Sequence, residues 1–423
     1  MSEDHRAGLL PSPPERDSTL AFLREGYDFI SNRCNALGSD AFATRLMLRP
    51  VTCLRGAEAA TMFYAPGRMS RRGAMPRSVV RLLQDHGSVQ VLDGAAHRQR
   101  RALFLGAMTP ERQGAARAFH AQELAAALDG PIPSPVRFDR LIEHVFCCTA
   151  LRWSGIPCSQ RSIYRRTQEL VAMFASAGRI GPARLRAACL RERSERWARK
   201  EIAMARAEPA ASGWLVDALI AHRDTDGAAL DDRSAAVELL NVLRPIVAVS
   251  RFATYALHAM AVHPEAIEWL WSRGDEDAAR AFGDEVRRLY PFFPVIGGTV
   301  RTPFTWRGLR FEAGEWLLLD LHGTCRDSAA WPEALRFDPA RHLRGAGKGA
   351  MIPQGGGDMD TGHRCPGEPL TQALLTETVA FLSDAGLTLP DQDLSLPRNR
   401  FPPRPLDGLL VQRALPASDR AHG

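Results

Sequence analysis

The sequence lacks several features that mark common classes of protein. Its 423 residues include eight cysteines, but none forms a CxxC pair and none has histidines at the spacing of a zinc site. No apolar run approaches the roughly 20 residues that are needed to span a bilayer. The chain also shows no internal repeat and no linker that would divide it. We therefore expect reduced thiols, a cytoplasmic location and no membrane span.

The start of the chain has no targeting pattern. The segment "MSEDHRAGLLPSPPERDS" is polar and rich in proline, and its acidic residues precede its basic ones. A signal peptide has a basic start and then an apolar stretch, which this segment does not have. We expect residues 1–18 to form a disordered leader and residues 19–423 to form a single domain.

Charge gives little indication of a macromolecular partner. The net charge is +6, with 45% hydrophobic and 24% charged residues, which is an ordinary globular composition. Most of the basic excess lies in residues 179–208, where acidic residues are interleaved. We interpret this stretch as the solvated face of a helix and expect no nucleic-acid partner.

The apolar pattern predicts a mainly α-helical protein with minor sheets. Helical spacing extends from about residue 98 to residue 262, with breaks at "LDGPIPSP", "GIPCS" and "HRDTDG". Strand-like alternation precedes it in "AFATRLMLRPVTCL" and follows it in "FTWRGLRFEAGEWLLLD", "LTLPDQDLSLP" and "DGLLVQRA". The strands should therefore gather in the outer thirds of the sequence.

An arginine and a proline stand side by side within one apolar helix, in "NVLRPIVAV". Asp231 and His263 bound this helix, so about 30 residues would extend over roughly 45 Å. An interior proline most often means only a kink, but a buried guanidinium needs an anionic partner. We interpret Arg244 as a group that binds the carboxylate of a substrate.

A second feature is the cysteine in "PQGGGDMDTGHRCPGEPL". Here a glycine-rich loop leads through Cys365 into a helix that begins near Pro366. Ligation of haem iron by a thiolate suits this arrangement, because backbone N–H groups at a helix start stabilise the sulfur charge. A buried structural cysteine is the alternative. The nearby "GAGKGA" lacks the spacing and the hydroxyl residue of a phosphate-binding loop.

These residues together resemble the cytochromes P-450. "GHRCPGE" is similar to the cysteine loop of that family, "EVRR" supplies its ExxR pair as Glu285 and Arg288, and "FDPAR" supplies a third arginine, Arg341. The resemblance implies the cytochrome P-450 fold, a single haem domain and haem b with iron bound by Cys365. It also implies that haem propionates are bound by three residues, His97, Arg101 and Arg364.

Two departures from the family pattern are informative. Most members carry an acid and a threonine in the long helix for proton delivery, whereas this chain has Arg244 and Pro245 there. Thr254 lies ten residues further on, roughly 15 Å along a helix, which is too far to replace that threonine. Asp358 stands where an aromatic residue usually precedes the cysteine. Both departures resemble one branch, the bacterial hydrogen-peroxide-dependent fatty-acid hydroxylases and decarboxylases.

This branch implies a function and a set of site residues. Arg244, with Pro245 beside it in the catalytic site, would pair with the fatty-acid carboxylate, which then acts as the general acid–base. Gln90 falls where relatives carry glutamine, associated with hydroxylation, or histidine, associated with decarboxylation. Phe293 and Val295 would line the substrate cavity, and Gln84 replaces a frequent phenylalanine. The implied reaction is hydroxylation of long-chain fatty acids at the α or β carbon, with minor decarboxylation to terminal alkenes.

The expected partners follow from the same branch. Long-chain fatty acid and hydrogen peroxide would be the substrates of a monomer that needs no dedicated redox partner. One alternative is a conventional cytochrome P-450 monooxygenase. Since the sequence contains no flavin or iron–sulfur module, such an enzyme would receive its electrons from separate ferredoxin and reductase proteins. A haem-binding sensor without catalysis is a third reading.

Overall fold

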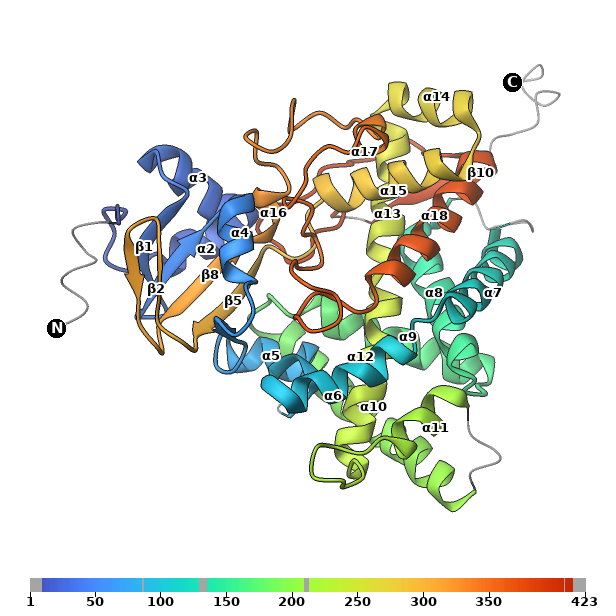
Figure 1. The fold of residues 1–423 in the computed structure, drawn as a ribbon. Coiled ribbons are helices and arrows are strands. Elements are labelled where there is room, and N and C mark those ends of the chain that lie inside the picture. Colours follow the sequence, from blue (N-terminus) through green and yellow to red (C-terminus); the bar gives the residue numbers. More distant parts are fainter. Residues whose placement is uncertain (1–9, 86, 129–134, 209–212, 407, 414–423) are drawn as a thin grey trace.

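The computed structural model describes residues 10–85, 87–128, 135–208, 213–406 and 408–413. Helices form most of this part of the protein (Figure 1). The helices are α2 (Thr19–Glu25), η1 (Gly26–Asp28), α3 (Phe29–Leu37), α4 (Ala57–Phe63), α5 (Arg77–Leu83), η2 (Val89–Val91), α6 (Gly94–Gly106), α7 (Pro110–Leu128), α8 (Phe138–Ser154), α9 (Gln160–Ala175), α10 (Pro182–Ala207), α11 (Trp214–Ala221), α12 (Asp232–Ala248), α13 (Ser250–Val262), α14 (Pro264–Arg273), α15 (Glu276–Leu289), α16 (Leu321–Thr324), α17 (Ala340–Leu343) and α18 (Glu368–Asp384). The strands are β1 (Ala41–Leu46), β2 (Arg49–Leu54), β3 (Met69–Ser70), β4 (Val136–Arg137), β5 (Val295–Val300), β6 (Phe304–Trp306), β7 (Leu309–Phe311), β8 (Trp316–Asp320), β9 (Leu387–Thr388) and β10 (Leu410–Arg413).

The strands form small sheets, as the sequence predicts. The largest has five strands in the order β1-β2-β8-β5-β3 and is antiparallel except for the parallel pair β2 and β8. A three-stranded sheet has the order β4-β10-β9, and β6 pairs with β7. In Figure 1 the five-stranded sheet lies with α2, α3 and α4 on one side of the molecule, and the longer helices lie on the other.

The long helix with the Arg-Pro pair is confirmed, with one interruption. The side chain of Asp231 caps α12 by accepting a hydrogen bond from the backbone N–H of Ser234, and α13 ends at Val262, directly before His263. Val249 alone separates the two helices, four residues after Pro245. Pro245 has no N–H to donate to the carbonyl of Asn241, whereas the Val249 N–H donates to the carbonyls of Pro245 at 3.2 Å and Ile246 at 3.1 Å. The helix contacts α8, α9 and α10 and lies in the main hydrophobic core.

The structure also contains elements that the sequence pattern does not predict. The strand β5 reads "VIGGTV", where two glycines hide the alternation. A side chain at Gly297 would meet the carbonyl oxygen of Ala74 at 2.0 Å, so the close approach of two chain segments explains the glycine. None of the described helices is long and apolar enough to cross a membrane.

Part of the predicted leader contacts the domain. Residues 1–9 lie outside the described residues, but Leu10 is buried and the carbonyl of Pro11 accepts a hydrogen bond from the N–H of Ala43. Ser18 is fully buried, and its N–H donates to the carbonyl of Arg45. Residues 10–18 therefore pack against β1. The division of the chain at residue 18 stays a prediction.

Candidate functional site

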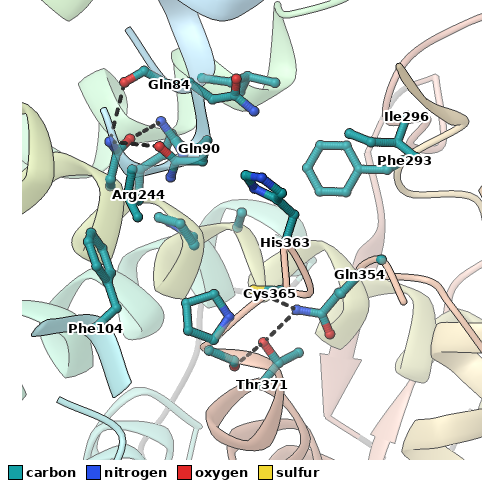
Figure 2. A pocket seen from close by; sticks show the side chains of 18 of the residues that line it. Gln84, Gln90, Phe104, Arg244, Phe293, Ile296, Gln354, His363, Cys365 and Thr371 are labelled. Carbon is teal, nitrogen blue, oxygen red and sulfur yellow. Dashed lines mark hydrogen bonds between the residues drawn. The ribbon is translucent and has the colours of Figure 1, made fainter. Parts of the chain in front are cut away.

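One cavity brings together the two features that the sequence singled out. Cys365, three residues before α18, and Arg244, near the end of α12, both line it. Figure 2 shows Arg244, Gln84 and Gln90 on one side of this cavity, and Cys365, Gln354 and Thr371 on another. The predicted site residues that line it are Gln90, His97, Arg101, Arg244, Pro245, Phe293, Val295 and Cys365. Residues distant in sequence thus share one site.

The glycine-rich loop fixes the position of Cys365. Its backbone N–H donates to the carbonyl of Gln354 at 3.2 Å, and the Gln354 amide nitrogen lies 3.8 Å from the sulfur. Gly355 has a φ of +92°, which favours glycine, and a side chain there would meet the Tyr64 hydroxyl at 3.1 Å. Burial raises the pKa of the Cys365 thiol, whereas the Gly367 N–H acts to lower it. A partly buried thiol that faces a cavity just before a helix suits a metal-bound thiolate.

Buried cationic groups surround the part of the cavity near the thiol. Arg101 donates to the backbone carbonyls of Met359 at 2.8 Å and Arg364 at 2.6 Å, and its Nη2 lies 3.8 Å from the Met359 sulfur. Arg71, which the sequence analysis does not identify, donates to the carbonyl of Gly297 at 2.6 Å. Neither guanidinium forms an ion pair with a carboxylate of the described residues. Two unneutralised buried cations fit an anionic ligand such as a haem propionate.

Two histidines complete this region. The rings of His97 and His363 pack with their centroids 4.1 Å apart. Burial and nearby arginines lower the pKa of His97 to about 4 and that of His363 to about 2, so both imidazoles are neutral near pH 7. Neutral rings can donate hydrogen bonds to an anion without adding charge. The sequence analysis does not identify His363, although it stands two residues before the cysteine.

Arg364 lies beside Cys365, and its predicted contact with a haem propionate stays a prediction. It is not among the residues that line the cavity, and its Nε donates to Glu368 at 2.6 Å. Glu368 lies four residues later, in the first turn of α18, and it also pairs with Arg287. An acid at this spacing competes for the guanidinium. The structure therefore turns Arg364 toward Glu368 and not into the cavity.

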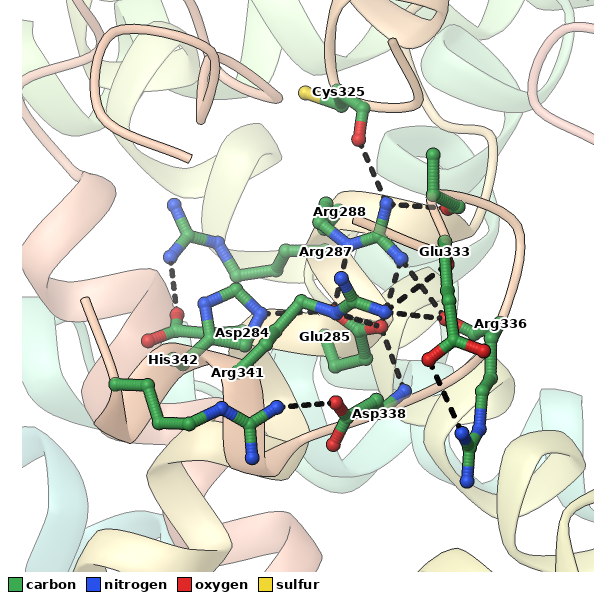
Figure 3. Close-up of polar contacts among 12 residues, drawn as sticks. Asp284, Glu285, Arg287, Arg288, Cys325, Glu333, Arg336, Asp338, Arg341 and His342 are labelled. Atoms are coloured by element: carbon green, nitrogen blue, oxygen red, sulfur yellow. Dashed lines mark hydrogen bonds and ion pairs between the residues drawn. The ribbon is translucent and has the colours of Figure 1, made fainter. Parts of the chain in front are cut away.

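The ExxR pair and the third arginine form the predicted ion network (Figure 3). Glu285 accepts hydrogen bonds from Arg288 at 2.7 and 2.8 Å, from Arg341 at 3.2 Å and from His342 at 2.9 Å. Burial acts to raise the pKa of Glu285, but the bonds from Arg288 and His342 outweigh it and hold the pKa at about 2. Arg288 also donates to the carbonyls of Cys325 and Ala334. This fully buried network ties α15 to the loops that precede the cysteine loop.

Arg244 is a buried cation without a carboxylate partner among the described residues. It is 6% exposed, and its one hydrogen bond runs from Nη1 to Oδ1 of Asn241 at 3.4 Å. Burial, together with repulsion from Arg191, lowers its pKa to about 9. Holding this charge in the cavity is costly unless a ligand supplies an anion. A carboxylate fits the two-pronged guanidinium best.

A chain of polar contacts through Asn241 and Glu238 holds the side chains of Arg244 and Gln90 in place. Nδ2 of Asn241 lies 3.3 Å from Oε1 of Gln90 and 3.0 Å from Oε2 of Glu238. Glu238 is fully buried and accepts from Arg100 at 2.9 Å, and Arg100 pairs in turn with Asp224. These contacts fix the Gln90 amide and the Asn241 oxygen that faces Arg244. No sequence pattern indicates this chain of contacts, because Gln90 and Arg100 lie 151 and 138 residues from their partners on α12.

Two other positions have local roles. Oδ1 of Asp358 accepts from the N–H groups of Asp360 and Thr361 at 3.1 and 2.7 Å, so it stabilises a turn where the family pattern has an aromatic residue. Thr254 donates to the carbonyl of Ser250 at 2.8 Å and does not line the cavity. No acid–threonine pair therefore accompanies Arg244 in the described lining of this site.

No family model matches the chain, but solved structures match nearly all of it. Cytochrome P450SP alpha (CYP152B1), solved in complex with (R)-ibuprophen, is 36% identical, with a TM-score of 0.89 over 94% of this chain and 98% of its own. Cytochrome P450EX alpha (CYP152N1), solved with myristic acid, is 33% identical, with a TM-score of 0.89 over 95% of this chain and 98% of its own. A variant of the cytochrome OleT in complex with arachidonic acid is 29% identical, with a TM-score of 0.90 over 96% and 99%.

The chain belongs to the cytochrome P-450 family. Within it, the chain falls in the fatty-acid peroxygenase branch, as the Arg-Pro pair predicts. The predicted mainly helical cytochrome P-450 fold is confirmed, and so is an oxidoreductase of the peroxygenase type. Cytochromes P-450 hold haem through a cysteine thiolate. The partly buried thiol, the glycine-rich loop, and Arg71 and Arg101, which have no carboxylate partner among the described residues, fit that group.

Proposed function

We propose that this cytochrome P-450 uses hydrogen peroxide to hydroxylate long-chain fatty acids at the α or β carbon. The observation that carries the proposal is the buried, carboxylate-free Arg244 guanidinium in the same cavity as the Cys365 thiol. Myristic acid and arachidonic acid, the ligands of two similar structures, are both long-chain fatty acids. An acid of this class would present its carboxylate to Arg244 and its first carbons toward Cys365.

The cofactor we propose is haem b. Cys365 would bind the iron through its thiolate, while Arg101, Arg71 and His97 would bind the propionates. When bound, this group supplies the oxidising chemistry that splits the peroxide O–O bond. The net reaction inserts one peroxide oxygen into a C–H bond and releases the other oxygen as water. The protein contributes a dry cavity, a fixed carboxylate and a fixed carbon chain.

Arg244 would make the substrate part of the catalyst. A carboxylate held by the guanidinium can accept a proton from hydrogen peroxide and return it to the oxygen that leaves as water. The chain offers no threonine in the described cavity lining near Arg244 for this task, since Thr254 lies elsewhere. Pro245 would leave the Asn241 carbonyl without its helical donor and keep this part of α12 rigid. Binding and proton transfer thus depend on one arginine.

Gln90 would favour hydroxylation over decarboxylation. Its amide oxygen accepts a hydrogen bond from Asn241, and an amide acts as neither an acid nor a base near neutral pH. An imidazole, with an unperturbed pKa of roughly 6.5, could donate a proton at the same place. Phe293, at the other side of the cavity from Gln90 (Figure 2), would contact the alkyl chain, as would Val295 in the same lining. Terminal alkenes should therefore be minor products.

The requirement for a carboxylate gives the sharpest test of this proposal. Haem-loaded protein is supplied with hydrogen peroxide and either a saturated fatty acid or the alcohol of the same length, and products are separated by chromatography. We expect hydroxylated acid and no oxidation of the alcohol. A short carboxylic acid added in trans should restore oxidation of a small apolar molecule, because it fills the place of the missing carboxylate. Equal turnover of the acid and the alcohol would contradict the role of Arg244.

The monomeric state, the independence from a dedicated redox partner and the cytoplasmic location predicted from the sequence stay predictions.

A further inference from the structure

A second cavity lies on the other side of α13 from the first. It holds about 470 Å³ between α8, α9, the start of α10, α13 and residues 400–404. Six arginines line it: Arg140, Arg179, Arg186, Arg251, Arg400 and Arg404. Glu143 is the one acidic residue in the described part of this lining. The cavity therefore carries a large excess of positive charge.

Arg251 lies at the buried end of this cavity. It is 2% exposed, yet its Nε and Nη1 have no hydrogen-bond partner among the described residues. Its Nη2 lies 3.7 Å from Oε1 of Glu143, which itself accepts no hydrogen bond there. A buried guanidinium with free donors is costly, so this end of the cavity favours binding of an oxygen acceptor. The next residue, Phe252, lines the first cavity, so α13 separates the two sites.

The other arginines are only partly neutralised, since one acid of the described lining, Glu143, is shared between Arg140 and Arg251. Glu143 pairs with Arg140 at 3.1 Å. Asp139, the nearest acid to Arg404 at 3.7 Å, is held in a two-pronged pair by Arg137 at 2.8 and 2.9 Å. Burial and repulsion from Arg251 lower the pKa of Arg404. Arg179 and Arg186 are exposed and lie at the rim. The cations are thus crowded and only partly compensated.

We propose that this cavity binds a small phosphate-bearing anion. A guanidinium binds phosphate in a two-pronged manner, and a phosphate group offers several acceptor oxygens and up to two charges to converging arginines. A single fatty-acid carboxylate would leave most of these charges unpaired, and the apolar residues in the lining are mainly alanines, which form no deep groove for an alkyl chain. The site would also give a role to Arg179 and Arg186, which belong to the basic stretch of residues 179–208.

Calorimetric titration of the haem-loaded protein tests the proposal. Inorganic pyrophosphate is the probe, with inorganic phosphate and acetate as comparisons, at low salt and at about 0.15 M salt. The variants are Arg251→Gln at the buried end and Arg404→Gln nearer the opening. Arg196→Gln is the control, since Arg196 is exposed on α10 and lines neither cavity. The carbon monoxide spectrum and the response to fatty acid confirm that each variant is folded and that the first cavity is intact.

We expect one pyrophosphate site in the natural sequence, and about tenfold weaker binding or more in each cavity variant, as the loss of a charge-assisted hydrogen bond predicts. Arg196→Gln should bind as the natural sequence does, and acetate should not compete. If Arg251→Gln does not fold, the comparison of Arg404→Gln with the control still decides. The proposal of a small free anion would be overturned by any of three results. These are equal affinity for pyrophosphate in all variants, no binding of pyrophosphate, and binding only to vesicles of phosphatidic acid. Each of these outcomes leaves the fatty-acid reaction untouched.

Discussion

Replacing Arg244 with methionine should stabilise the ligand-free protein and abolish its response to fatty acid. Burial and Arg191 lower the pKa of Arg244 from 12.5 to about 9. At about 1.36 kcal/mol for each tenfold change in acidity, this lowering corresponds to a cost of the buried charge on the order of 5 kcal/mol. Methionine has a similar length and no charge, and replacements of buried ions by apolar residues gain about 1 to 4 kcal/mol. We expect the free energy of unfolding of ligand-free Arg244→Met to exceed that of the natural sequence by an amount in this range.

Thermal unfolding of haem-loaded, fatty-acid-free protein measures this gain. For 423 residues, an unfolding entropy of about 2.1 cal/mol/K per residue gives about 0.9 kcal/mol/K, so Tm should rise by about 1 to 4 °C. Adding a saturated fatty acid should raise the Tm of the natural sequence and leave that of Arg244→Met unchanged. Arg196→Met, at an exposed position, serves as the control. A less stable ligand-free Arg244→Met, or an equal rise of Tm with fatty acid in both proteins, would refute the reasoning.

Three further predictions concern other parts of the site. Gln90→His should increase the share of terminal alkene among the products from one saturated acid under limiting peroxide, and an unchanged product ratio would remove the role of position 90. Cys365→Ser should lose the long-wavelength Soret band of the reduced carbon monoxide adduct, because that band depends on sulfur donation, and an intact band would exclude Cys365 as the ligand. The pKa of Glu285 falls from 4.5 to about 2 on folding, so its ionised form should add up to about 3 kcal/mol to the free energy of unfolding above pH 4.5. This contribution should disappear as the pH falls toward 2. In Glu285→Gln, the slope of unfolding free energy against pH between 2 and 4.5 should fall by the equivalent of up to one proton taken up on unfolding. An unchanged slope would contradict the proposed network.

The main parts of the site can be predicted because each has a strong local signal. A charged residue beside a proline within an apolar helix is costly, so Arg244 and Pro245 indicate a function from the sequence alone. The glycine-rich loop before Cys365 and the one-turn spacing of Glu285 and Arg288 are equally local. Their order along the chain then indicates the family.

The remaining parts depend on contacts between distant segments. Arg71 donates to Gly297, 226 residues away, and Asn241 contacts Gln90, 151 residues away, so neither contact leaves a pattern in one stretch of sequence. The position of Arg364 beside Cys365 predicts a haem contact, which stays a prediction, and its Nε donates to Glu368 four residues later. The strand β5 is not predicted because close packing requires glycine at Gly297, and glycine weakens the strand pattern.

The most direct test of the central claim is the choice of oxidant. Purified haem-loaded protein is incubated with a saturated long-chain fatty acid, either with hydrogen peroxide alone or with NADPH, ferredoxin and ferredoxin reductase in the presence of catalase, and the products are quantified by chromatography. We predict α- or β-hydroxylated acid with peroxide alone and none with the electron-transfer proteins. Product formed only with the electron-transfer proteins would contradict the account and favour a conventional monooxygenase.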